Sequence, residues 1–245
     1  MATTIDSQVS INKEELSRLE KTLNYRFTNL RLLHKSLIHS SYAFEHSRGG
    51  KDNEKLEFLG DAVLDLVIGH ILFKRYDSMR EGELTRLRSA LVNEHHLAKM
   101  AREINLGDYI FLGKGEEASH GRDKSSILSC AYEAVIGAIF EDGGYSAVCE
   151  VVERLFLPDI EGKKEALLVA DAKSRLQEEL QDKFNEAPVY VTDLEEGPAH
   201  QRVFTISATF RGEVLGVGRA KSKKEAEQKA AAEGLKKIAA GKAGL

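Results

Sequence analysis

The pattern of apolar residues changes once along the chain, and this change limits the possible folds more than any other feature. Up to about Leu157, apolar residues recur at helical spacing with almost no strand-like alternation. After residue 170, one helical stripe is followed by three alternating segments and a closing helix. We therefore expect an all-α domain followed by a small α+β domain with the order α-β-β-β-α. The expected helices of the first domain cover residues 13–22, 29–40, 55–75, 82–91, 93–103, 125–141 and 145–156.

The boundary between the domains is expected in the short, partly charged segment 161–170, which we interpret as a linker. The predicted domains are residues 1–160 and 171–240, with a tail at 241–245. In the second domain, the stretch "RVFTISATF" places Phe204, Ile206, Ala208 and Phe210 on one strand face. Ser222 and Glu225 have the spacing of a capping box at the start of the last helix.

The composition indicates a broad class of protein but does not indicate its activity. The chain has 245 residues with a net charge of −4, which is no global sign of a nucleic-acid partner. The segment from Arg219 to Lys242 is an exception, because it holds 8 basic and 3 acidic residues. Cys130 and Cys149 form no CxxC or disulfide pattern, and neither a signal peptide nor a membrane span is evident. We therefore expect a cytoplasmic protein with no membrane partner.

Acidic residues interrupt an otherwise apolar helix between Leu56 and Phe73. Glu57 and Asp61 are four residues apart, which places them about 40° apart around the helix axis, and Glu54 lies about 60° from Glu57. No Lys or Arg lies between Leu56 and Phe73. Carboxylates are rarely buried unless they are paired or bound to a metal ion.

A second apolar helix, from Ile127 to Phe140, carries Glu133. If the two helices pack together, Glu57, Asp61 and Glu133 converge, and two carboxylates about 5 Å apart repel by roughly 3 kcal/mol. A hard cation such as Mg²⁺ would offset this repulsion. The alternative is that each acid pairs with a distant Arg or faces water. The chemistry alone suits a phosphodiesterase, a nucleotide hydrolase or a structural ion.

Several motifs carry a resemblance to a known family. The stretch "NEKLEFLGDAVLD" resembles the signature of the ribonuclease III family, and "SILSCAYEAVIGAIFEDGG" resembles its second catalytic helix. The stretch "REGELTRLR" is similar to a third family motif and places Glu81 at its acidic position. The C-terminal motifs "SRLQEELQ", "GPAHQRVF" and "KSKKEAEQKAA" resemble a double-stranded-RNA-binding domain. The resemblance covers roughly residues 12–240.

The resemblance implies a homodimeric endoribonuclease of the ribonuclease III endonuclease fold. Such an enzyme hydrolyses double-stranded RNA, including rRNA precursors and other structured RNAs, to 5′-phosphate and 3′-hydroxyl ends. It needs Mg²⁺, for which Mn²⁺ can substitute, and no small-molecule cofactor. By this resemblance, Glu57 and Glu133 hold the metal, Asp61 positions the attacking water or a second metal, and Glu54 and Glu81 are supporting acids. Phe58 inserts into the partner protomer, and its alternative role is ordinary core packing.

One position departs from the family pattern. The second helix of the family has an Asp three residues before its Glu, and this chain has Cys130 there. Sulfur is a poor ligand for Mg²⁺, so we expect weaker metal binding that more Mg²⁺ or Mn²⁺ rescues. The thiol can also be a small buried apolar residue. A competing hypothesis is therefore a double-stranded-RNA-binding protein that does not cleave. A helical nucleotide hydrolase would leave the second domain without a role.

The start of the last helix is a predicted phosphate contact. Lys221, Lys223 and Lys224 gather there around the cap residue Ser222, where the helix dipole already favours anions. A solvated basic face is the alternative interpretation.

Two further segments are predicted to reach the minor grooves of an RNA duplex. The first helix of the second domain exposes one side that can meet 2′-hydroxyls, and the loop "GPAH" follows. Together with the lysines they would span about 16 base pairs. The residues concerned are Ser174, Gln177, Glu178 and Gln181 on the helix, and His200 in the loop.

Overall fold

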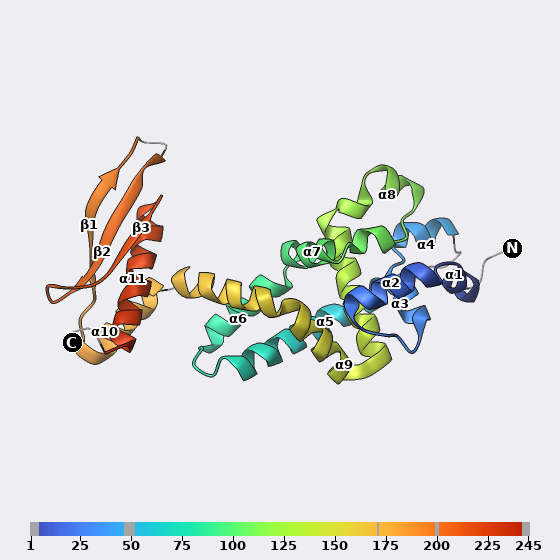
Figure 1. The fold of residues 1–245 in the computed structure, drawn as a ribbon, viewed down its shortest axis with the longest axis horizontal. Helices are drawn as coiled ribbons and strands as arrows, with labels where there is room; N and C mark the ends of the chain where they lie inside the picture. Colours follow the sequence, from blue (N-terminus) through green and yellow to red (C-terminus); the bar gives the residue numbers. More distant parts are fainter. Residues whose placement is uncertain (1–4, 47–51, 171, 199–200, 242–245) are drawn as a thin grey trace. The chain divides into compact units, whose positions relative to one another are not determined.

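The computed structural model describes residues 5–46, 52–170, 172–198 and 201–241. Its contacts divide the chain into two compact units, Met1–Ile160 and Glu161–Leu245. The first unit is helical (Figure 1). Its helices are α1 (Ile5–Ile11), α2 (Lys13–Leu23), α3 (Leu30–Ser36), α4 (Ser40–His46), α5 (Glu54–Arg75), α6 (Glu81–Val92), α7 (Glu94–Glu103), α8 (Lys114–Ala118) and the start of α9 (Ser125–Ala170), with short 3₁₀ turns at Leu106–Tyr109 and Gly121–Asp123.

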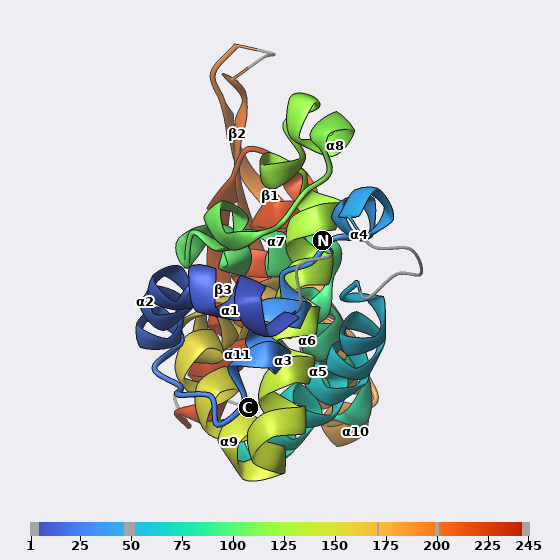
Figure 2. The ribbon, with the colours of Figure 1, turned by 90° about the vertical axis from the view of Figure 1, so that its right-hand side faces the viewer.

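The first half of α9 runs among the other helices of the first unit, and α5 packs against it at one side (Figure 2). The side chains of Leu64 and Ile68 in α5 are almost fully buried, as are those of Val135 and Ile139 in α9. This burial explains the apolar face that each helix turns toward the core.

Helix α9 turns sharply at Gly144, where φ is 71° and ψ is −169°. A side chain is strained at such a φ, whereas glycine adopts it freely. The turn lies where the sequence predicted a break between two helices. Beyond it α9 continues to Ala170, so the segment 161–170 that we expected to be a linker is helical.

The helix predicted over residues 29–40 is present but shorter, because α3 ends at Ser36 and a second short helix, α4, begins at Ser40. Between them Ile38 forms a bridge with Phe111. The Phe111 N–H donates to the Leu37 carbonyl at 2.8 Å, and the His39 N–H donates to the Phe111 carbonyl at 3.1 Å. This pairing with a distant segment ends the helix.

The second unit has the predicted order α-β-β-β-α. Its antiparallel sheet has the strand order β1-β2-β3, and α11 packs on β2, β3 and α10. Ile206, Ala208 and Phe210 are buried, as the alternation in β2 predicted. The Ser222 hydroxyl caps α11 by accepting from the Glu225 N–H at 3.3 Å. The elements are α10 (Ala172–Phe184), β1 (Val189–Glu196), β2 (Val203–Phe210), β3 (Glu213–Ala220) and α11 (Lys223–Ala239).

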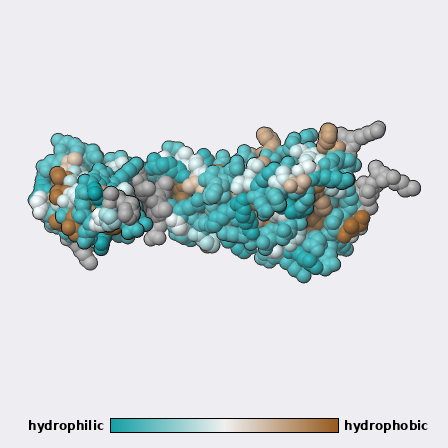
Figure 3. Space-filling model, turned by 90° about the horizontal axis from the view of Figure 1, so that it is seen from above, coloured by the Kyte–Doolittle hydropathy of each residue, from teal (hydrophilic) through white to brown (hydrophobic). Residues whose placement is uncertain are grey.

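The visible surface of each unit is largely hydrophilic, with small separate groups of apolar residues (Figure 3). None of the helices in the described ranges combines the length and the apolar character that crossing a membrane requires.

Candidate metal centre and nucleic-acid interface

The start of α5 is held by Asn53, which is buried. Its side-chain amide donates to the Ser36 carbonyl at 3.2 Å, and its N–H donates to the Ile38 carbonyl at 2.9 Å. Its own carbonyl accepts from the Glu57 N–H at 2.9 Å. The first turn of α5, which carries Glu57, is therefore tied to the segment between α3 and α4.

Two glycines allow α5 and α9 to cross in backbone contact. A Cβ atom on Gly60 would lie 1.8 Å from the carbonyl oxygen of Glu133. A Cβ atom on Gly137 would lie 2.2 Å from the carbonyl oxygen of Leu56. No side chain fits at either position, so the crossing depends on both glycines. Neither glycine was predicted from the sequence to position the site, although each lies three or four residues after a predicted metal ligand.

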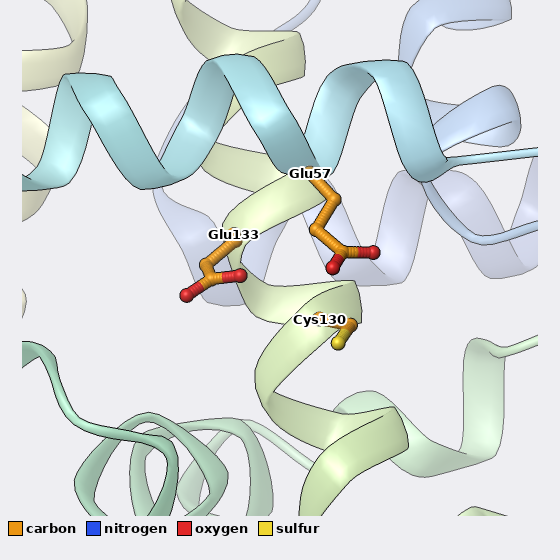
Figure 4. Close-up of side chains that lie close together, drawn as sticks. All are labelled: Glu57, Cys130 and Glu133. Carbon is orange, nitrogen blue, oxygen red and sulfur yellow. The ribbon is translucent and has the colours of Figure 1, made fainter.

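The crossing brings Glu57, Cys130 and Glu133 together. Each offers one ligand atom, and these atoms lie within 4.8 Å of one another. The three side chains come from α5 and α9 and lie close together (Figure 4). All three are partly buried. Over the described parts of the chain, no other three His, Cys, Asp or Glu side chains meet the same distance limit.

The acidic groups of this site affect the pKa values of their neighbours. Burial, followed by the charges of Asp61 and Glu57, raises the pKa of Glu133 to about 7. Burial and a hydrogen bond to Glu57 raise the pKa of the Cys130 thiol to about 12. Both shifts indicate that added negative charge is unfavourable here and that a cation would be stabilised.

The two glutamates have no basic side chain beside them in the part of the chain that the structure describes. Within the residues that the structure describes, neither Glu57 nor Glu133 forms an ion pair with Lys, Arg or His. The alternative in which each acid pairs with a distant Arg therefore does not apply to them. Their oxygens suit a hard divalent cation, whereas the Cys130 sulfur does not.

The other predicted acids lie outside this group. Asp61 is exposed on α5 and close enough for its charge to affect Glu133. Glu54 is exposed at the first position of α5. Glu81 is exposed at the start of α6, where its carboxylate accepts from the Thr85 hydroxyl at 2.9 Å. It lines the groove between α5 and α6 that Phe73 also lines.

Phe58, next to Glu57 in the sequence, has 81% of its surface exposed. The alternative of ordinary core packing in its own protomer is therefore wrong. Leu66 and Phe73 are also exposed, at 58% and 70%. At about 100° per residue, both lie within about 80° of Phe58 around α5, so the three form an apolar stripe.

The predicted RNA-contacting residues of the second unit lie on α10 and at the start of α11. On α10, all four predicted side chains are exposed: Ser174, Gln177, Glu178 and Gln181. At α11, the ammonium group of Lys223 lies 2.6 Å from a carboxylate oxygen of Glu195 in β1. Lys221 and Lys224 are exposed, and neither forms an ion pair with a described residue. His200 lies outside the described residues.

Comparisons with known proteins cover both units. A family model described as Ribonuclease-III-like matches residues 29–160, and one described as Double-stranded RNA binding motif matches residues 172–238. The protein named Ribonuclease 3 from Desulfotalea psychrophila is 66% identical over 227 residues, which cover 93% of this chain and 94% of that protein. Ribonuclease 3 from Syntrophotalea carbinolica is 48% identical over 218 residues, covering 89% and 94%.

Solved structures agree with this similarity. The crystal structure of the nuclease domain of ribonuclease III from Campylobacter jejuni matches with a TM-score of 0.54 and 44% identity. The match covers 58% of this chain and 94% of that one. A second structure of that domain, whose title concerns flexibility in a region involved in dimer formation, matches with the same TM-score and 45% identity, covering 57% and 94%.

Proposed function

Because this chain belongs to the ribonuclease III family and is a double-strand-specific endoribonuclease, we propose that its hydrolysis of duplex RNA depends on a divalent cation held by Glu57 and Glu133. The products would be 5′-phosphate and 3′-hydroxyl ends. The substrates would be rRNA precursors and other structured RNAs that contain long duplexes. The cation would be Mg²⁺ or Mn²⁺.

One observation supports this site above all: Glu57 and Glu133 converge where two helices cross, and no basic side chain among the described residues forms an ion pair with either. When bound, a divalent cation would acidify a coordinated water and offset the charge that develops on the phosphate. Asp61 is exposed one turn after Glu57, where its carboxylate can orient the attacking water and accept its proton. Glu54 and Glu81 would support this centre electrostatically.

The second unit would hold the duplex by its shape. The exposed residues of α10 would meet 2′-hydroxyls in one minor groove, and His200 would reach the next. Lys221, Lys223 and Lys224 would contact phosphates between them, together with backbone N–H groups of the first turn of α11. The Ser222 cap occupies the Glu225 N–H, so the N–H groups of Lys223 and Lys224 are the ones left for an anion.

The active form would be a homodimer. The apolar stripe of Phe58, Leu66 and Phe73 is exposed in the single chain, and burying such side chains against a second copy is favourable. The dimer-forming nuclease domain of the Campylobacter jejuni relative supports this proposal. Phe58 would insert into the partner protomer.

The test is cleavage of a long labelled duplex RNA across a titration of Mg²⁺ and Mn²⁺. The variant Glu133→Gln keeps the size of the side chain but removes its charge, and we expect it to lose cleavage while still binding the duplex. Glu150→Gln is the matched control, because Glu150 is an exposed acid on the same helix. Cleavage by Glu133→Gln at the rate of Glu150→Gln would refute the site. Duplex binding by the unmodified chain without cleavage under any cation would favour a non-cleaving RNA-binding protein instead.

A further inference from the structure

The candidate metal centre contains a donor that Mg²⁺ does not use. Two of its three ligand atoms are carboxylate oxygens, and the third is the sulfur of Cys130. Cys130 lies one helical turn before Glu133 on α9, close to both glutamates (Figure 4). Its sulfur lies within 4.8 Å of a carboxylate oxygen of Glu57 and of one of Glu133. Its immediate surroundings are therefore partly polar, which a purely apolar packing role would not require.

The separations of the three donor atoms suit a small ion after modest adjustment. In a tetrahedral site with metal–oxygen distances near 2.0 Å and metal–sulfur distances near 2.3 Å, the ligand atoms lie roughly 3.5 Å apart. The donor atoms here lie within 4.8 Å of one another. We expect side-chain rotation of Glu57 and Cys130 to close this difference.

Cations differ in how many of these donors they use. Mg²⁺ prefers oxygen ligands and keeps its waters, so only the two carboxylates would bind it strongly. Zn²⁺, Co²⁺ and Cd²⁺ accept thiolate together with carboxylate, so all three side chains would bind them. The thiol therefore favours the second class of ions at the expense of the first.

We propose that this centre binds a thiophilic divalent cation of the Zn²⁺ or Co²⁺ class in preference to Mg²⁺, with the Cys130 sulfur as a direct ligand beside Glu57 and Glu133. The inference rests on the proposed function, because it concerns the same metal centre. As the sulfur–metal bond forms, the S–H bond breaks and the proton passes to solvent. No electron is transferred, so the metal keeps its oxidation state.

Co²⁺ is the probe for a direct test, because a thiolate bound to Co²⁺ gives a near-ultraviolet charge-transfer absorption. The full-length variant Cys149→Ser leaves Cys130 as the only thiol, since the chain has two cysteines. We expect this variant to bind one Co²⁺ per chain with that absorption, and an equal concentration of Mg²⁺ should not displace the ion. Zn²⁺, but not Mg²⁺, should slow the reaction of Cys130 with a thiol reagent by at least about tenfold.

Two variants separate the roles of the thiol and the carboxylates. Cys130→Ser in the same background should lose the absorption, and Cys130→Asp should regain Mg²⁺ affinity by roughly 10–100-fold. Equilibrium dialysis that finds Co²⁺ bound without the absorption would overturn the proposal while leaving the carboxylate centre intact. Mg²⁺ binding that is equal in all variants would also overturn it. If neither Co²⁺ nor Mg²⁺ binds to any variant, the proposed metal-dependent function fails as well.

Discussion

Gly60 of α5 faces Gly137 of α9 with no side chain between them. A Cβ atom on either glycine would lie 3.0 Å from the backbone nitrogen of the other, and closer still to a neighbouring carbonyl group. The two helix backbones therefore touch at this point. The separation of Glu57 from Glu133 is a direct consequence of this contact.

Replacing Gly137 by Ala should therefore destabilise the protein. The added methyl group must push the helices apart, which typically costs about 1–3 kcal/mol, and more where backbone atoms are the obstacle. Urea unfolding of the metal-free protein would measure the loss. Gly115→Ala is the control, because a Cβ atom there meets nothing within 4 Å. Equal stability of the two variants would contradict the contact between the helices.

The stability of the metal-free protein should depend on the ionisation of Glu133. Its pKa of about 7 in the folded chain lies above the ordinary value of 4.5, so the folded state binds more protons between these values. Stability should therefore fall as pH rises from about 4.5 to 7, by on the order of 2 kcal/mol. Glu133→Gln should remove this part of the pH dependence, and Glu150→Gln should keep it. Thermal unfolding at several pH values in the presence of a chelator would show whether the two variants differ.

The end of α11 that carries Lys224 should determine the electrostatic part of RNA binding. Lys224→Ala removes one proposed phosphate contact, so the slope of log affinity against log salt should become shallower by about 1. Lys236→Ala makes the same charge change in the last turn of α11 and should leave the slope unchanged. Binding of a non-cleaved duplex at four salt concentrations measures both. A similar slope for the two variants would argue against the phosphate contact.

Self-association should depend on Phe58. Phe58→Asp places a charge in the proposed interface, and we expect the dimer to dissociate at least tenfold more readily in sedimentation experiments. Phe44→Asp is the control, because Phe44 is 90% exposed and belongs to α4 and not to the apolar stripe of α5. An unchanged dimer in Phe58→Asp would place the interface elsewhere.

The sequence predicted that Glu57 and Glu133 would meet, but it did not predict the distances between the side chains of the site. Periodicity placed Glu57 and Glu133 in two apolar helices, and burial of those helices makes their meeting a reasonable expectation. Periodicity does not fix where two helices cross, which here depends on Gly60 and Gly137. For the same reason the sequence alone could not predict that Cys130 joins the two glutamates within 4.8 Å, whereas Glu81 stays outside that group.

The helical spacing of apolar residues also could not predict backbone pairing between segments that are distant in the sequence. Residues 29–40 have apolar spacing that suits one helix, but the pairing of Ile38 with Phe111 divides it. Local turns were more predictable, because glycine and capping residues act over short distances. The turn at Gly144 and the cap at Ser222 are examples.

The carboxylate of Asp142 has a consequence for the order in which the chain folds during synthesis. It accepts from the Tyr25 hydroxyl and from the N–H groups of Thr28 and Asn29, each at 2.8 Å. The Tyr25 bond joins residues 117 positions apart in the sequence. At a translation rate of about 5–20 residues per second, the segment around Tyr25 must wait roughly 6–23 seconds for its anchor to be made. During that interval α2 can already pack on α1, α3 and the turn at Leu106–Tyr109, whereas Tyr25, Thr28 and Asn29 gain their shared acceptor only when α9 emerges.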